Sequence, residues 1–150
     1  MRDRFDSFTY LILKLSKIIQ KIKNVEVEEF GLKAIHVMCI YHLNQNPRGL
    51  TASEIVALTL EDKAAISRAL NLLKEMDIVN YEPKKYNGIV SLTIHGIEIA
   101  EKIDEKAKTA VDAGSYNLNM AEREVLYRSL SKIEDNLDNY YKELVGNEEE

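Results

Sequence analysis

The chain has 150 residues, of which 45% are hydrophobic and 30% charged, and its formal net charge at pH 7 is −5. This length and composition predict one domain, or one subunit of a compact oligomer, with a buried core, and exclude a disordered chain. The negative net charge argues against a general nucleic-acid coat protein, and the short apolar runs exclude a membrane-spanning segment.

Two features of the sequence indicate the cellular compartment in which the protein resides. The only cysteine, Cys39, excludes a disulfide within the chain and is typical of a reducing compartment. The first ten residues, MRDRFDSFTY, lack the apolar core of a signal peptide. We therefore expect a cytoplasmic protein.

Charge is distributed unevenly along the chain. Residues 1–24 carry six basic and two acidic side chains, a net charge of +4, whereas residues 48–93 carry six of each. Residues 98–150 carry seven basic and fourteen acidic side chains, a net charge of −7. The acidic excess therefore lies outside the central segment, and acidic C-terminal helices could pair with the basic N-terminal helix.

The N-terminal segment predicts a helix with an apolar seam. Its large apolar side chains recur at the 3-4 spacing of a heptad pattern. These residues are Phe5, Phe8, Ile12, Leu15, Ile19 and Ile22. We expect a break at residues 24–29, followed by a second helix from about Leu32 to Leu43. This second helix is apolar on most sides, which is typical of a helix at the centre of its domain.

Two capped helices are expected next. Thr51 and Glu54 have the spacing of a capping box before a short helix over residues 52–58, which should bury Ile55, Val56 and Leu58. Asp62 has the character of an N-cap for a helix over residues 63–76. The spacing of Ile66, Leu70 and Leu73 places these side chains on the buried face of that helix.

The opposite face of the helix over residues 63–76 carries small, polar and basic side chains. These are Lys63, Ala64, Ser67, Arg68, Asn71 and Lys74. Such a face suits a groove lined by phosphates and base edges. The alternative is an ordinary solvated helix face, and the neighbouring elements favour DNA contact.

Two short strands are expected over residues 78–81 and 89–92, joined by a turn that contains Lys84, Lys85, Tyr86, Asn87 and Gly88. The Asn-Gly pair predicts a tight hairpin because both residues tolerate positive φ. The two lysines suit phosphate contacts. As an alternative, a charged tip keeps a sheet edge from pairing with other chains.

The C-terminal part predicts two more helices. Thr93 can cap a helix from about Ile94 to Ala113, and a capping box at residues 119–122 precedes the last helix. This last helix carries a second heptad seam, formed by Leu126, Leu130, Ile133, Leu137, Tyr140 and Leu144. A monomer could close the two terminal seams on each other, but their length favours two chains that interleave them.

The sequence offers little support for a metal site or a catalytic site. His36, Cys39 and His42 have H-x2-C-x2-H spacing, but the two histidines lie about 120° apart around a helix, and no fourth ligand for zinc is present. We therefore expect two packed histidines, a packed thiol and no metal. The chain has no glycine-rich phosphate loop, nucleophile elbow or HExxH motif, so no enzymatic activity and no cofactor are expected.

The order of elements and residues 51–96 resemble the MarR (multiple antibiotic resistance regulator) family of transcription factors. The resemblance lies in TASEIVAL, in DKAAISRALNLLKEMDIV, in the hairpin and in its exit through Leu92, Thr93 and Gly96. It implies a mainly α fold with a small β-wing, in which a winged helix-turn-helix is flanked by N- and C-terminal dimerisation helices. Residues 1–150 would form one subunit, with DNA-binding residues 30–95 and dimerisation segments 1–24 and 96–146.

The resemblance implies roles for particular residues. Ser67 and Arg68 match recognition-helix positions that face the major groove, and Lys84–Gly88 match the tip of the wing. The wing of the family usually carries an Asp-x-Arg pair, and this chain has Lys-Lys-Tyr-Asn-Gly there, so Lys84 and Lys85 are expected to contact phosphates instead. The expected DNA-binding residues are Thr51, Ser53, Lys63, Ala64, Ser67, Arg68, Asn71, Lys84, Lys85, Tyr86, Asn87 and Gly88.

The remaining expected sites concern the dimer and an effector. The expected dimer interface comprises Phe5, Phe8, Ile12, Leu15, Ile19, Leu130, Ile133, Leu137 and Tyr140. Many members of the family bind a lipophilic or anionic small molecule between the dimer region and the winged unit, and His36, Tyr41 and His42 lie on the helix that would line such a cleft.

Together these features predict a sequence-specific DNA-binding transcriptional regulator, a homodimeric repressor of a palindromic operator that a small effector releases. The partners expected are double-stranded DNA, a second copy of the chain and the effector, with no membrane. Two alternatives stay open at this point: a winged-helix module that binds protein, and a metal-responsive regulator that uses His36 and Cys39. A steep fall of affinity with salt would favour DNA over a protein partner.

Overall fold

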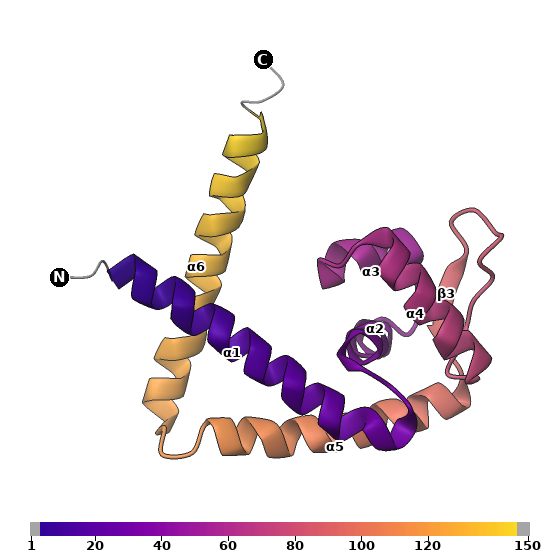
Figure 1. Cartoon of the computed structure of the whole chain (residues 1–150), viewed down its shortest axis with the longest axis horizontal. Helices are drawn as coiled ribbons and strands as arrows, with labels where there is room; N and C mark the ends of the chain where they lie inside the picture. Colours follow the sequence, from indigo (N-terminus) through magenta and orange to yellow (C-terminus); the bar gives the residue numbers. More distant parts are fainter. Residues whose placement is uncertain (1–3, 147–150) are drawn as a thin grey trace. The chain divides into compact units, whose positions relative to one another are not determined.

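A computed structural model describes residues 4–146, and for Arg4 and Phe5 it describes the backbone alone. The chain divides into two compact units, Met1–Ala110 and Val111–Glu150, each of which is considered by itself. In chain order the helices and strands are α1 (Arg4–Val27), the 3-10 helix η1 (Glu28–Phe30), α2 (Ala34–Gln45), β1 (Leu50–Thr51), α3 (Ala52–Thr59), α4 (Lys63–Glu75), β2 (Val79–Asn80), β3 (Ile89–Leu92), α5 (Ile94–Gly114) and α6 (Met120–Gly146). The mainly α fold with a small β-wing is confirmed (Figure 1).

Helix α2 lies at the centre of the first unit, as its apolar sequence predicts. It packs against α1, α3, α4 and β3. Cys39, Ile40 and Leu43 of α2 are almost completely buried, and they share one core with Ile55 of α3 and with Ile66, Leu70 and Leu73 of α4. The core therefore fixes the helix-turn-helix formed by α3 and α4 on the scaffold of α2.

The expected burial of Leu58 in α3 is wrong. Ile55 is fully buried and Val56 packs against the core, but 47% of Leu58 is exposed. Helix α3 ends one residue later, at Thr59, and the chain turns at Leu60 with a φ of 56°. Leu58 therefore lies at the edge of the helix-turn-helix, where the chain is already leaving the core.

The expected break at residues 24–29 begins later in the chain. Helix α1 continues to Val27, which is 2% exposed and belongs to the core. Asn24 lies within α1, and its side-chain oxygen accepts a hydrogen bond from the backbone N–H of Ala34 at 2.7 Å, which links α1 to the start of α2. The turn between α1 and α2 is made by η1 and by Gly31, whose φ is 70°.

The sheet has three antiparallel strands in the order β1-β3-β2. Leu50 pairs with Val90, and Val79 pairs with Leu92. Strand β1 was not expected from the sequence, and β2 is shorter than the expected strand over residues 78–81. Gly49 permits the β1 pairing, because its φ is 86° and a β-carbon there would collide with the carbonyl group of Val90.

Thr93 fixes the base of the wing to α5, as its expected capping role implies. Its hydroxyl accepts a hydrogen bond from the backbone N–H of Gly96 at 2.9 Å and donates to the carbonyl oxygen of Asp77 at 2.5 Å. Its backbone N–H donates to the carbonyl oxygen of Ile78 at 3.0 Å. The end of the wing and the start of α5 are therefore held to the segment that follows α4.

In the second unit, the capping box of α6 is confirmed. The backbone N–H of Asn119 donates to the carboxylate of Glu122 at 2.8 Å, and the N–H of Glu122 donates to the side-chain oxygen of Asn119 at 3.0 Å. Arg123 donates to the carbonyl oxygens of Ser115 and Leu118 and so stabilises the turn before α6. None of the helices in residues 4–146 is both long enough and apolar enough to cross a membrane.

Candidate nucleic-acid interface

Helix α4 presents the predicted polar face to solvent. Asp62 caps the helix, because its side-chain oxygen accepts a hydrogen bond from the N–H of Ala65 at 2.8 Å. Ile66, Ala69, Leu70 and Leu73 are buried on one side. On the other side Lys63, Ala64, Arg68 and Asn71 are exposed, and Ser67 is half-buried. The face expected to contact DNA is thus the accessible face of the helix.

At the start of α3, the capping box uses the hydroxyl group of Thr51. This hydroxyl accepts a hydrogen bond from the N–H of Glu54 at 3.2 Å and also lies 3.1 Å from the carboxylate of Glu54. Thr51 is half-buried, whereas Ser53, in the first turn of α3, is exposed. Of the two residues expected to contact DNA here, Ser53 is the more accessible.

The tip of the wing spans residues 81–88 and projects beyond the strands (Figure 1). Lys84, Lys85, Tyr86 and Asn87 are all exposed there. The prediction of a tight Asn-Gly hairpin is wrong, because only Asn87 of this pair has a positive φ, 52°. Two successive turns replace it, with hydrogen bonds from the N–H of Lys85 to the carbonyl oxygen of Glu82 and from the N–H of Gly88 to that of Lys85.

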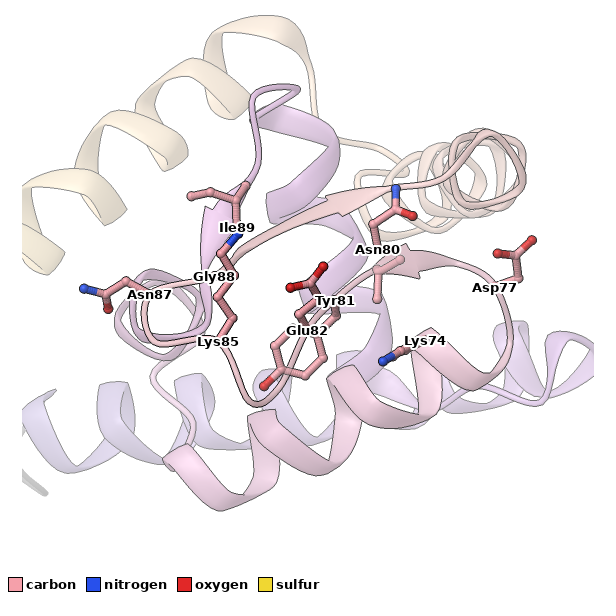
Figure 2. A pocket seen from close by; sticks show the side chains of 10 residues that line it. Lys74, Asp77, Asn80, Tyr81, Glu82, Lys85, Asn87, Gly88 and Ile89 are labelled. Atoms are coloured by element: carbon pink, nitrogen blue, oxygen red, sulfur yellow. The ribbon is translucent and has the colours of Figure 1, made fainter.

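A hollow of about 500 Å³ lies between the end of α4 and the wing (Figure 2). Lys74 contributes to it from α4, and Tyr81, Glu82 and Lys85 contribute from the wing. Asp77 also lines it, so that two basic and two acidic residues border this space. The hollow separates the exposed face of α4 from the basic tip of the wing.

The basic side chains of the interface are not neutralised by neighbouring carboxylates. In the part of the chain that the structure describes, the ion pairs within 4.0 Å are His95–Glu98, Glu29–Lys106 and Asp138–Lys142. None of these pairs involves Lys63, Arg68, Lys84 or Lys85. These four cations are therefore available to a polyanion, although the net charge of residues 48–93 is zero.

The three residues expected to line an effector cleft differ in their surroundings. His36 is buried, and its Nδ1 accepts a hydrogen bond from the N–H of Lys33 at 2.9 Å, so it acts in the cap of α2. Tyr41 is exposed, and its ring lies edge-on to that of His42 with 5.1 Å between the ring centres. His42 is half-buried. The three side chains therefore do not share one role.

A polar cluster between α1 and α2 could not be predicted from the sequence. The Nζ atom of Lys23 lies 3.1 Å from the sulfur of Met38, and burial lowers the pKa of Lys23. The Nε2 atom of His42 is enclosed and has no hydrogen-bond partner among the described residues. Burial and the charge of Lys23 lower the pKa of His42. This cluster joins residues 15 or more positions apart, so no local motif indicates it.

Two residues of the H-x2-C-x2-H motif, His36 and Cys39, have structural roles. The thiol of Cys39 is fully buried, and burial together with the nearby charge of Glu61 raises its pKa to about 12. The Nδ1 atom of His36 is already used by the backbone of Lys33. Within the described residues, no group of three or more His, Cys, Asp or Glu side chains could hold a metal ion.

Helices α2, α3 and α4 with the three-stranded sheet form a winged helix-turn-helix, and this architecture defines a class of DNA-binding domain. Residues 30–85 match the sequence profile of the MarR family. The family resemblance predicted from the sequence is confirmed over these residues, which span the helix-turn-helix and the start of the wing. No protein of curated function matches the chain.

Solved structures share the fold over nearly the whole chain. A MarR protein from Peptoclostridium difficile is 19% identical, with a TM-score of 0.83 over 96% of this chain and 95% of its own. A MarR transcriptional regulator from Methanosarcina mazei is 17% identical, with a TM-score of 0.83 over 91% and 92% of the two chains. MepR from S. aureus, solved in complex with DNA, is 19% identical, with a TM-score of 0.76 over 87% and 97%.

Proposed function

We propose that this protein is a homodimeric repressor that binds a palindromic operator and is released from it by a small molecule. The observation that carries the proposal is the exposed face of α4, which holds Arg68 and Asn71 beside the small side chain of Ala64. Residues 30–95 would bind the DNA, and the helical segments 1–24 and 96–146 would join the two subunits.

The chemistry of the exposed side chains, which suits both the grooves and the backbone of DNA, supports this proposal. Arg68 and Asn71 are of the residue types that read base edges in the major groove, and the exposed Lys84 and Lys85 suit phosphates at the minor groove. MepR, a protein of the same fold, has been solved in complex with DNA. In this chain the exposed Ser53 of α3 and Lys63 at the start of α4 would add phosphate contacts.

The homodimer is supported by apolar side chains that the two terminal helices leave exposed. Ile12, Leu15 and Ile19 of α1 are 36–49% exposed, and Leu137 and Tyr140 of α6 are 48% and 58% exposed. Phe8, Leu130 and Ile133 of the same expected interface are half-buried, and Phe5 lies outside the residues whose side chains are described. Patches of this kind mark protein interfaces, and a second copy of the chain offers the matching seams.

A palindromic operator follows from the two-fold symmetry of such a dimer. Two copies of α4 about 34 Å apart would enter successive major grooves on one side of the DNA. A dimer seated on a promoter excludes other proteins from the same stretch of DNA, which is the physical basis of repression.

Release by a small molecule is supported by the polar cluster of Lys23, Met38 and His42. The ammonium group of Lys23 has a thioether as its partner, and the enclosed Nε2 of His42 has none within the described residues. A carboxylate or phenolate would satisfy both groups better than the protein does. An anionic effector that binds between α1 and α2 could change the distance between the two recognition helices, provided that it favours one arrangement.

The test is binding of the purified protein to the DNA upstream of its own gene, measured by fluorescence anisotropy at two salt concentrations. The proposal expects binding that prefers this DNA over a scrambled fragment and that weakens steeply with salt. In transcription from the same promoter in vitro, the added protein should lower the yield of transcript. Equal binding to both fragments, or a transcript yield that the protein raises, would contradict it.

A further inference from the structure

The outermost ridge of α4 consists of four exposed residues at the spacing 4-3-4, namely Ala64, Arg68, Asn71 and Glu75. These positions lie opposite the buried side chains of Ile66, Leu70 and Leu73. Residues on this ridge point directly away from the buried face, so they face the floor of a groove that α4 enters with its exposed side. The chemistry of this ridge therefore determines which bases the helix can read.

Each of the first three ridge residues matches one kind of base edge. The guanidinium group of arginine binds O6 and N7 of guanine with two hydrogen bonds, and the amide of asparagine binds N6 and N7 of adenine in the same way. A small apolar side chain such as that of Ala64 suits the methyl group of thymine. Among the described residues no carboxylate lies within 4.0 Å of Arg68, so its guanidinium group is free to bind a base.

The helical spacing sets the distance between these contacts. With a rise of about 1.5 Å per residue, Arg68 and Asn71 are separated by about 4.5 Å along the axis, and Ala64 precedes Arg68 by about 6 Å. Base pairs stack at about 3.4 Å. The guanine and the adenine should therefore lie about one to two base pairs apart, with the thymine about two base pairs to the other side of the guanine.

Glu75 limits how much of α4 can enter the groove. It is the last residue of the helix, it is exposed, and Asp77 follows it closely in the chain. Together with the exposed Lys74, these two carboxylates give this end a net charge of −1, which phosphates repel. The N-terminal two and a half turns, from Lys63 to Asn71, are the part of α4 that DNA can approach closely.

We propose that each half of the operator contains a guanine read by Arg68 and an adenine read by Asn71, one to two base pairs apart, with a thymine methyl group against Ala64. This inference rests on the proposed function, in which α4 enters the major groove. It goes further by naming the bases and by assigning the specificity of the protein to two side chains.

The test is selection of bound sequences from a random DNA pool, carried out with the full-length protein and with matched variants. The native protein should select half-sites that contain the guanine and the adenine at this spacing. Arg68→Ala should lose the preference at the guanine alone and bind the selected site roughly 5- to 100-fold more weakly, and Asn71→Ala should lose the preference at the adenine alone. Arg48→Ala and Asn80→Ala, which change exposed residues of the same types outside α4, should leave the selected sequence unchanged.

A change of specificity provides a second readout that loss of folding cannot imitate. Glutamine binds adenine with two hydrogen bonds, so Arg68→Gln should replace the preferred guanine by adenine at one position of the half-site. Replacement of that guanine by 7-deazaguanine, which lacks N7, should weaken binding of the native protein and have little effect on Arg68→Ala.

The outcomes separate this inference from the proposed function. If the native protein selects a defined sequence that neither Arg68→Ala nor Asn71→Ala alters, the assignment of the bases is wrong while sequence-specific DNA binding stands. If the native protein selects no sequence at all, both are wrong. A selected half-site without guanine would also overturn the role of Arg68.

Discussion

Gly96, at the start of α5, lies so close to the carbonyl oxygen of Ile78 that no β-carbon fits between them. The same carbonyl oxygen accepts a hydrogen bond from the N–H of Thr93 at 3.0 Å, and Thr93 in turn caps α5 through the N–H of Gly96. This contact joins the segment after α4 to the residue that follows β3. The position of the wing relative to α4 therefore depends on the absence of a side chain at residue 96.

The first prediction concerns this contact. Gly96→Ala should lower the free energy of unfolding by about 1–3 kcal/mol, because the added methyl group forces backbone apart in a packed region. Gly114, at the end of the same helix, has no atoms within 4 Å of an added β-carbon, so Gly114→Ala should be neutral or stabilise by up to about 1 kcal/mol. Urea unfolding of the two variants measures both free energies. If Gly96→Ala and Gly114→Ala are equally stable, a β-carbon fits at residue 96 and the close contact with Ile78 is wrong.

The second prediction concerns the pH dependence of stability. Burial, aided by the charge of Lys33, lowers the pKa of His36, and its Nδ1 must be unprotonated to accept the hydrogen bond from Lys33. Because the pKa in the folded state is below the unfolded value of about 6.5, the stabilising contribution is complete above that pH and is lost as the pH falls through the folded pKa.

The variant His36→Gln tests this assignment, since glutamine can also occupy the third position of a capping box and does not titrate. Its stability near pH 7.5 should resemble that of the native protein, and it should lose less stability between pH 7 and pH 5 in urea unfolding. His42 is still present in this variant and its pKa is also lowered, so part of the pH dependence of stability remains. The exposed His95 provides the control, and an effect of His95→Gln as large as that of His36→Gln would contradict the assignment.

The third prediction concerns the basic tip of the wing. Lys84→Ala and Lys85→Ala should weaken binding to all DNA sequences by similar factors, because phosphate contacts carry no sequence information. Each should also reduce the slope of log affinity against log salt concentration by about 0.9 for each phosphate that the variant no longer neutralises. Anisotropy titrations over a range of salt concentrations give both quantities, with Lys102→Ala on the exposed surface of α5 as the control. An unchanged slope in both variants would show that the wing does not bind the phosphates.

The fourth prediction concerns the apolar seam of α1. Ile19→Glu should convert the dimer to monomers and lower operator affinity by more than about tenfold, because a charge would be buried at the interface. Leu13, 58% exposed on the same helix, does not belong to the seam, and Leu13→Glu should leave the dimer intact. Sedimentation equilibrium distinguishes the two states. If the Ile19→Glu variant stays a stable dimer, the interface does not include this seam.

The elements that could be predicted well from the sequence depend on interactions between neighbours in the chain. The caps at Thr51, Asp62, Thr93 and Asn119 are all made within three residues, and the hydrogen bonds of the structure confirm each of them. The buried face of α4 follows from helical periodicity alone. The exposed face of α4 follows in the same way, which is why most of the candidate interface could be named from the sequence.

The features that the sequence did not reveal depend on contacts between distant residues. Strand β1 has two residues and exists because Gly49 allows the chain to lie against Val90, about forty residues later. The contact between Lys23 and Met38 and the enclosed Nε2 of His42 arise where α1 meets α2. The tip of the wing has a sequence compatible with a tight hairpin, but β2 ends at Asn80, and the longer loop that results is bridged by two turns.

One comparison of affinities tests most directly whether α4 reads the operator. The native protein and Arg68→Ala are each titrated with the promoter DNA of the protein's own gene and with a scrambled fragment, at one fixed salt concentration. We expect the native protein to prefer the promoter and Arg68→Ala to bind it roughly 5- to 100-fold more weakly, while binding to the scrambled fragment weakens much less. Equal affinities of the two proteins for the promoter would contradict the claim that the exposed ridge of α4 reads the operator.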